Sequence, residues 1–293
     1  MPIIRKLFVL THPINLLFAL LTYGMGLGFS RYLGVSLRIE SQFMGGFAVL
    51  LLIASSRLLT EYFRPFNEPL WLGETKLERI ELHQYLLTVS LSCLGAVVVL
   101  LFLLYRDGFM NVEVALFALI FVILALMNAV PPFRLVNHGF GELSDSLQIA
   151  CITPILAFLL QYGKFNRVLT IFTIPLLFIA LAYFLALNFP SYAEDLKYER
   201  KTMLTRLSWE RGIPIHDMLL AVAYFSFAAV PFLGISFDLV WPALLTLPIS
   251  AYQVIVLRNI SDGAKPNWPL FSATSAMIFG LTVYLIVLTF WLH

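Results

Sequence analysis

The densest mixture of charged residues lies between residues 188 and 212, directly after an apolar run that ends at Asn188. This stretch places acids within two helical turns and basic residues directly after them: Glu194, Asp195 and Glu199, then Arg200, Lys201, Arg206 and Arg211. Carboxylates at the point where a membrane helix meets water can hold Mg²⁺, and adjacent cations can hold phosphate. The stretch therefore predicts a site for a lipid diphosphate. The alternative is a solvated loop whose positive charge orients the chain in the membrane.

A second polar set ends an earlier apolar run, in SSRLLTEYFRPFNEP (residues 55–69). Arg57 and Glu61 are four residues apart, so they share one helix face and can pair. Pro65 ends the helix and delivers Glu68 just beyond it. Charges at membrane depth normally face a cavity or each other. Two interpretations therefore stay open: Glu61 and Glu68 belong to a metal or diphosphate site, or Arg57 and Glu61 form a structural pair.

Spacing also groups side chains near the first stretch. Asn188, Ser191 and Asp195 are spaced i, i+3, i+7, which puts them on one face if the helix continues past Pro190. Upstream, Asp145 lies near the start of another apolar run. It either complements the positive end of a helix dipole or faces the interior. The five histidines are scattered, so no zinc site is predicted, and no nucleotide-binding fingerprint is present.

The elements that must position these residues are membrane helices. The chain is 60% hydrophobic and 12% charged, with a mean hydropathy of +0.88. A soluble protein of this length could not bury so much apolar surface. The apolar runs lack the period-2 alternation of a membrane β-barrel, so we expect an all-α fold. We expect membrane lipid around the protein and no nucleic-acid partner, and the oligomeric state stays open.

Apolar runs long enough to cross a bilayer predict nine spans. They lie near residues 13–31, 42–62, 86–105, 112–130, 143–162, 168–188, 215–235, 238–257 and 269–291. The loops on the side of the N-terminus carry most of the 19 Lys and Arg residues, so we expect the N-terminus in the cytoplasm and the C-terminus outside. We expect one domain over residues 1–293, in which long cytoplasmic loops near 63–85 and 189–214 cap a central cavity. The four spans between these loops suggest a weak internal repeat.

Two segments resemble the UbiA superfamily of membrane prenyltransferases. PPFRLVNHGFGEL (residues 131–143) resembles the family's Pro-Pro-x-Arg/Lys-Leu run followed by Gly-x-Gly-Glu. NFPSYAEDLKYERKTMLTRL (residues 188–207) resembles its second acidic motif. Asn188 matches the leading Asn of that motif and Asp195 its final Asp, and the basic tail matches at Arg200, Lys201 and Thr202. The resemblance covers the whole chain and implies nine helices around a central cavity.

This sequence departs from the family pattern in both acidic motifs. Ser191 replaces the first Asp of the second motif. The first motif, Asn-Asp-x-x-Asp-x-x-x-Asp, here reads Thr60, Glu61, Arg64 and Glu68. Arg64 therefore reverses the charge at a position where the resemblance implies a metal ligand.

The resemblance implies transfer of a prenyl group from an isoprenoid diphosphate to a hydrophobic aromatic or lipid acceptor, with Mg²⁺ as cofactor. With the motifs altered, two outcomes stay open for Mg²⁺. Glu61, Glu68, Glu194 and Asp195 still bind it, with Arg57 and Arg64 contacting the diphosphate in place of one ion, or Mg²⁺ is lost. The alternative is a non-catalytic lipid-binding or assembly protein with the same fold. A secondary transporter would need polar breaks near mid-bilayer, whereas these charges lie near span ends.

The predicted site follows from the motifs and the charge pattern. The expected catalytic residues are Asp195, Glu61 and Glu68. The expected metal ligands are Asp195, Glu68, Glu61 and Glu194. The expected diphosphate-binding residues are Arg57, Arg64, Asn188, Ser191, Arg200, Lys201 and Arg206.

Overall fold

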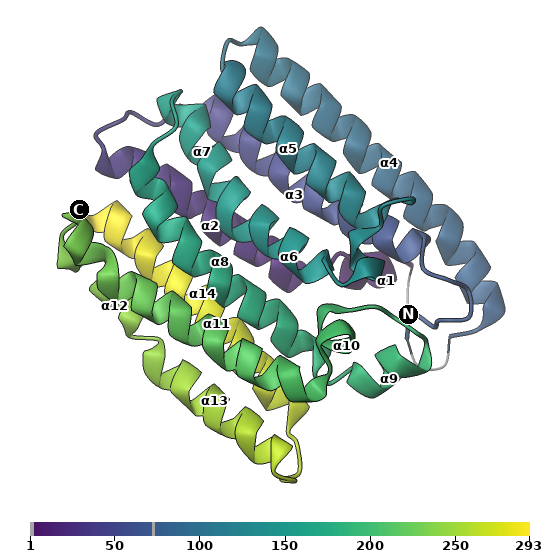
Figure 1. The fold of residues 1–293 in the computed structure, drawn as a ribbon. Coiled ribbons are helices and arrows are strands. Elements are labelled where there is room, and N and C mark those ends of the chain that lie inside the picture. Colours follow the sequence, from purple (N-terminus) through teal and green to yellow (C-terminus); the bar gives the residue numbers. More distant parts are fainter. Residues whose placement is uncertain (1–2, 72–73) are drawn as a thin grey trace.

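The computed structural model describes residues 3–71 and 74–293, and all of its regular elements are helices (Figure 1). Within these residues, nine helical stretches are long and apolar enough to cross a membrane, and the protein is a multi-pass membrane protein. Six spans are single helices: α2 (Pro13–Tyr32), α3 (Ile39–Tyr62), α4 (Lys76–Arg106), α5 (Val112–Ala129), α8 (Arg167–Asn188) and α14 (Trp268–Leu292).

The other three spans join consecutive elements. They are α6 (Gly141–Ser146) with the π-helix η2 (Leu147–Ile152) and α7 (Thr153–Tyr162), then α11 (Trp209–Ala229) with η3 (Val230–Leu233), and α12 (Trp241–Leu244) with α13 (Leu247–Ser261). Short elements complete the chain: α1 (Ile3–Leu10), η1 (Leu135–His138), α9 (Tyr192–Lys197), α10 (Met203–Leu207) and η4 (Phe237–Leu239).

Two helices begin earlier than the apolar runs indicate. Helix α4 begins at Lys76 and not near residue 86, because Thr75 forms a capping box with Glu78 that satisfies its first backbone N–H groups. Helix α11 begins at Trp209 and not near residue 215. The segments between spans are therefore the first loop (residues 63–75) and the second loop (residues 189–208), shorter than the expected 63–85 and 189–214. Residues 1–2 and 72–73 of the expected domain lie outside the described residues.

Helices α6, α11 and α14 pack directly against α8. Phe18 of α2 lies edge-on to Tyr183 of α8 and to Phe279 of α14, with ring centroids 5.2 and 5.0 Å apart. Helices α2 and α7 approach so closely at Gly26 that a Cβ there would lie 2.1 Å from the carbonyl oxygen of Pro154. Only glycine allows this approach, as is typical of helix contacts in membranes.

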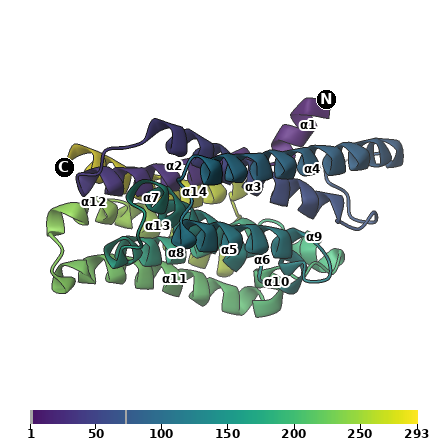
Figure 2. The ribbon, with the colours of Figure 1, turned by 90° about the horizontal axis from the view of Figure 1, so that it is seen from above.

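One end of the bundle collects the polar segments. In Figure 1, α1, α6, α9, α10 and the loop from α3 to α4 lie at the same end, and the C-terminus lies at the other. Figure 2, seen from above, keeps α9 and α10 at the end of the bundle where α1 and the α3–α4 loop lie. We call this end the site end. It brings together the two loops that carry the acidic motifs.

Candidate active site

A cavity of about 290 Å³ opens at the site end. Its lining comes from α2, α3, α6, α8, α9 and the two loops. Eight of the lining residues are charged: the acids Glu68, Glu142, Asp145 and Asp195, and the arginines Arg57, Arg64, Arg134 and Arg200. A hollow with this many opposed charges at a span end is suited to a charged ligand.

Arginines and carboxylates alternate across this cavity. The Arg64 guanidinium contacts both oxygens of Glu61, at 3.0 Å from Nη2 and 2.9 Å from Nε, and its Nε lies 4.0 Å from Glu68. Arg200 donates from Nε to the same Glu68 oxygen at 2.8 Å and from Nη1 to Asp195 at 3.2 Å. The resulting ion chain runs Glu61–Arg64–Glu68–Arg200–Asp195. It joins the first acidic motif to the second.

Local backbone geometry sets the second half of the ion chain. Ser191 precedes α9, and its hydroxyl donates to Asp195 Oδ2 at 2.9 Å. The backbone N–H of Arg200 donates to the carbonyl oxygen of Asp195 at 2.8 Å, and this hydrogen bond closes a turn after α9. Ser191, at the altered motif position, therefore orients the acid that remains.

The pKa values of this pair reflect burial and charge. Burial raises the pKa of the Asp195 carboxyl, and the hydrogen bonds from Ser191 and Arg200 limit the rise. Burial alone would lower the pKa of Arg200, but Glu68 and Asp195 outweigh it and the net shift is upward. The Arg200 guanidinium therefore stays charged.

Arg57 pairs across the bundle and not along its own helix. Its Nη2 lies 2.7 Å from Asp145 Oδ2, and Asn128 donates to the other Asp145 oxygen at 2.9 Å. The Arg57–Glu61 pair considered from the sequence is not formed, because Glu61 is taken by Arg64. Of the two interpretations of Asp145, the structure supports the interior one: the residue is only 9% exposed.

Glu142 joins the glycine-rich motif to the second loop. Its Oε1 accepts from Asn188 Nδ2 at 2.6 Å and from the backbone N–H of Met203 at 3.0 Å. Its Oε2 is buried without a hydrogen-bond partner among the described residues. Glu142 therefore holds α10 against the end of α8.

Two cavity residues lie at strained backbone positions. His12 has φ 53° and Arg134 has φ 34°, in the region that L residues rarely adopt. The Arg134 guanidinium has a buried Nε that lacks a hydrogen-bond partner among the described residues. Burial lowers the pKa of Arg134, which nevertheless remains a cation at neutral pH. Enclosure by the protein, and then the charges of Arg57 and Arg64, lower the pKa of His12, so its ring is neutral.

Two of the remaining predicted residues line an outer basin of about 710 Å³ beside the cavity. Lys201 and Arg206 line the basin, and Asp195 and Arg200 line both hollows. The Asp195–Arg200 pair therefore forms part of the wall between the basin and the cavity. Glu194 is exposed on α9 and lines neither hollow.

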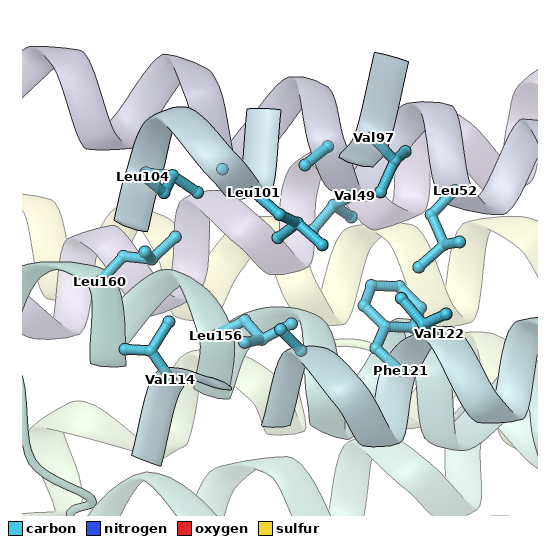
Figure 3. Close-up of a pocket in the computed structure, with 13 residues that line it drawn as sticks. Val49, Leu52, Val97, Leu101, Leu104, Val114, Phe121, Val122, Leu156 and Leu160 are labelled. Carbon is cyan, nitrogen blue, oxygen red and sulfur yellow. The ribbon is translucent and has the colours of Figure 1, made fainter. Parts of the chain in front are cut away.

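A second void contains no such chemistry. It lies between α3, α4, α5 and α7, measures about 30 Å³, and is lined by aliphatic side chains and Phe121, as Figure 3 shows. Leu101 and Val97 of α4 project toward Leu52 and Phe121 across it. With no titratable group in its wall, this void is a packing feature, and the charged cavity is the candidate site.

Several solved structures are similar to the chain over nearly its full length. A UbiA homolog from Archaeoglobus fulgidus bound to DMAPP and Mg²⁺ has a TM-score of 0.62 at 19% identity, over 96% of this chain and 99% of that one. A structure of a UbiA homolog from the same organism bound to GPP and Mg²⁺ covers the same shares at 19% identity, with a TM-score of 0.59. The chain has the UbiA fold. The all-α, nine-span architecture expected from the motifs is confirmed.

A further UbiA-fold neighbour is digeranylgeranylglyceryl phosphate synthase, with a TM-score of 0.58 at 14% identity over 100% of this chain and 98% of that one. No family model matches the sequence, and no curated protein matches it. The similarity to these solved structures is therefore one of fold.

The UbiA fold raises the question of Mg²⁺, which needs several oxygen ligands at about 2.0–2.1 Å in octahedral geometry. Within residues 3–71 and 74–293, no group of three His, Cys, Asp or Glu side chains could hold a metal ion. Arg64 faces Glu61 and Glu68, and Arg200 faces Glu68 and Asp195. A divalent ion about 4 Å from a guanidinium would be repelled by roughly 8 kcal/mol at an effective dielectric constant of about 20. In this arrangement, the residues present do not fit Mg²⁺.

Proposed function

We propose that the protein is an intramembrane prenyltransferase that transfers a prenyl group from an isoprenoid diphosphate to an aromatic or lipid acceptor. The observation that carries this proposal is the convergence of four arginines on one cavity of a UbiA fold: Arg57, Arg64, Arg134 and Arg200. The distribution of Lys and Arg supports a cytoplasmic location for the site end.

The arginines are suited to the diphosphate. A guanidinium presents five N–H donors in a planar fork that matches phosphate oxygens. Arg134 supplies a guanidinium whose buried Nε has no partner among the described residues, and Arg200 uses two of its five donors on Glu68 and Asp195. Lys201 and Arg206, in the outer basin, would attract the anion toward the cavity.

The reaction requires a stabilised leaving group. The bond between the first prenyl carbon and the diphosphate oxygen breaks, and the electron pair stays with the oxygen. The arginines stabilise the charge that develops there. The acceptor forms a bond to the allylic carbon and releases a proton. The departing diphosphate can take this proton.

The apolar part of the wall would hold the prenyl chain. Val136, Phe184 and Leu187 line the cavity beside the arginines. The Phe184 ring lies 5.8 Å from the Arg57 guanidinium carbon, so it faces positive charge already. An aromatic face attracts a cation, and an allylic cation formed here would benefit in the same way.

A non-catalytic lipid-binding protein remains the second candidate. It is favoured by the ion chain, because Arg64 and Arg200 already pair with the carboxylates that the motifs supply. Such a protein would bind the same diphosphate and leave it intact.

Turnover of a labelled prenyl diphosphate separates these candidates. Purified protein in lipid nanodiscs would be incubated with radiolabelled geranyl diphosphate and a panel of aromatic and glycerol-based lipid acceptors. We expect a prenylated lipid and free diphosphate, both reduced in Arg57→Ala and unchanged in Arg167→Ala at the opposite end of α8. Binding without product from any acceptor would support the non-catalytic candidate. Absence of both binding and product would reject the diphosphate site.

A further inference from the structure

We propose that Arg64 and Arg200 replace the metal, so that this cavity binds an isoprenoid diphosphate without a divalent ion. This inference rests on the proposed function and specifies which form of the substrate the site takes: the free diphosphate anion and not its Mg²⁺ complex.

Arg64 lies between the two carboxylates of the first acidic motif. It contacts Glu61 at 2.9 and 3.0 Å and reaches Glu68 at 4.0 Å. A metal ion bound by Glu61 and Glu68 would have to share this space with a guanidinium of the same sign. Arg64 is only partly exposed and backed by Arg79, which donates to its carbonyl oxygen at 3.1 Å, so its backbone is held in place.

Arg200 occupies the corresponding position between the two motifs. It bridges Glu68 of the first loop and Asp195 of the second at 2.8 and 3.2 Å. Carboxylates contributed by two loops would be joined by a shared ion in a metal site; here one guanidinium joins them. The two arginines therefore contact all three acids, Glu61, Glu68 and Asp195.

The cations can still serve a ligand. Each guanidinium has five N–H donors, and Arg200 donates only two of them to carboxylates. Arg134 adds a guanidinium with no ion pair to an acid of the described chain. An entering diphosphate would bind the remaining donors, while the carboxylates keep the guanidiniums oriented. Glu61, Glu68 and Asp195 are then positioning residues.

The test is equilibrium binding of geranyl diphosphate to the purified protein, in EDTA and in excess Mg²⁺. We expect wild-type affinities in the two conditions to agree within about threefold. An increase of tenfold or more on adding Mg²⁺ would overturn the inference and leave the proposed function standing. Absence of binding in both conditions would instead reject the proposed function.

Two kinds of variant sharpen the test. Arg64→Asp should weaken binding in EDTA by about 10- to 100-fold, the size expected for one charged hydrogen-bonding group. Unchanged binding in EDTA would count against the inference.

Asp195→Asn and Glu61→Gln keep a carbonyl oxygen for the arginines but remove a charge that a metal would need. We expect both to bind in EDTA as well as wild type or better, whereas a metal site would lose affinity. Arg167→Ala, at the opposite end of α8, serves as the control.

Discussion

Arg200 Nε donates to Glu68 Oε2 at 2.8 Å, across 132 positions of sequence. This contact fastens the first loop to the second and closes the ion chain over the cavity. Because Arg200 also holds Asp195, one side chain fixes the relative placement of both acidic motifs.

Removing this side chain should loosen both loops. In Arg200→Ala, we expect faster hydrogen–deuterium exchange in residues 63–71 and 189–208, with the centres of the spans unchanged. Arg206→Ala is the matched control, because Arg206 lies on the same segment but its side chain donates to the His138 carbonyl and to no acid of the described first loop. Equal exchange in wild type and Arg200→Ala would show that the contact does not hold the loops.

The Arg57–Asp145 pair should matter most for stability. Both side chains are largely buried, and their charged atoms lie 2.7 Å apart. Asp145→Ala leaves Arg57 as an uncompensated buried charge, which typically costs about 3–5 kcal/mol. We expect a clear drop in melting temperature in detergent, and a smaller drop when Arg57→Leu is added. If the double variant is no more stable than Asp145→Ala, the unpaired charge of Arg57 is not the cause of the lost stability.

The sequence predicted the nine spans because each is a long apolar run, a property that does not depend on the rest of the fold. It misplaced the start of α4 because residues 76–85 are amphipathic and polar. The signal that was available there is the Thr75–Glu78 capping box, a short-range pattern outside the apolar run.

The site was predictable only as far as local spacing reaches. Glu68, Asp195 and Arg64 were found because they fall in motifs, and the structure brings them together. For Arg57 the spacing offered Glu61, four residues away, as one possible partner, whereas its partner Asp145 lies on another span. Arg134 and Glu142 were not assigned to the site, although both lie in the motif at residues 131–143. Their roles depend on tertiary contacts that no spacing reveals.

Neutralising Asp195 should stabilise the protein in a pH-dependent way. The pKa of the Asp195 carboxyl is raised in the folded state, so its ionised form costs stability above that pKa, and the cost is lost as pH falls through it. We expect Asp195→Asn to melt at a higher temperature than wild type at about pH 8. The difference should shrink toward about pH 4, near the ordinary range of a carboxyl. If Asp195→Asn melted at a lower temperature than wild type at every pH, the ionised Asp195 carboxylate would not be destabilising, contrary to this prediction.

Glu142 should act through its accepting oxygen and not through its charge. Glu142→Gln retains an oxygen for Asn188 and for the backbone N–H of Met203, whereas Glu142→Ala leaves both donors unpaired. We expect faster proteolysis of the second loop in Glu142→Ala only. Limited trypsin digestion at Arg200, Lys201 and Arg206 gives the readout. If both variants were digested equally, and faster than wild type, the charge of Glu142 and not its accepting oxygen would protect the second loop.

The most direct measurement is an anomalous difference map from crystals grown with geranyl diphosphate and Mn²⁺, which reports metal and diphosphate in the same experiment. If Arg64 and Arg200 replace the metal, we expect diphosphate density in contact with both arginines and no manganese peak in the cavity. A manganese peak between Glu61, Glu68 and Asp195, with Arg64 displaced from them, would contradict the account.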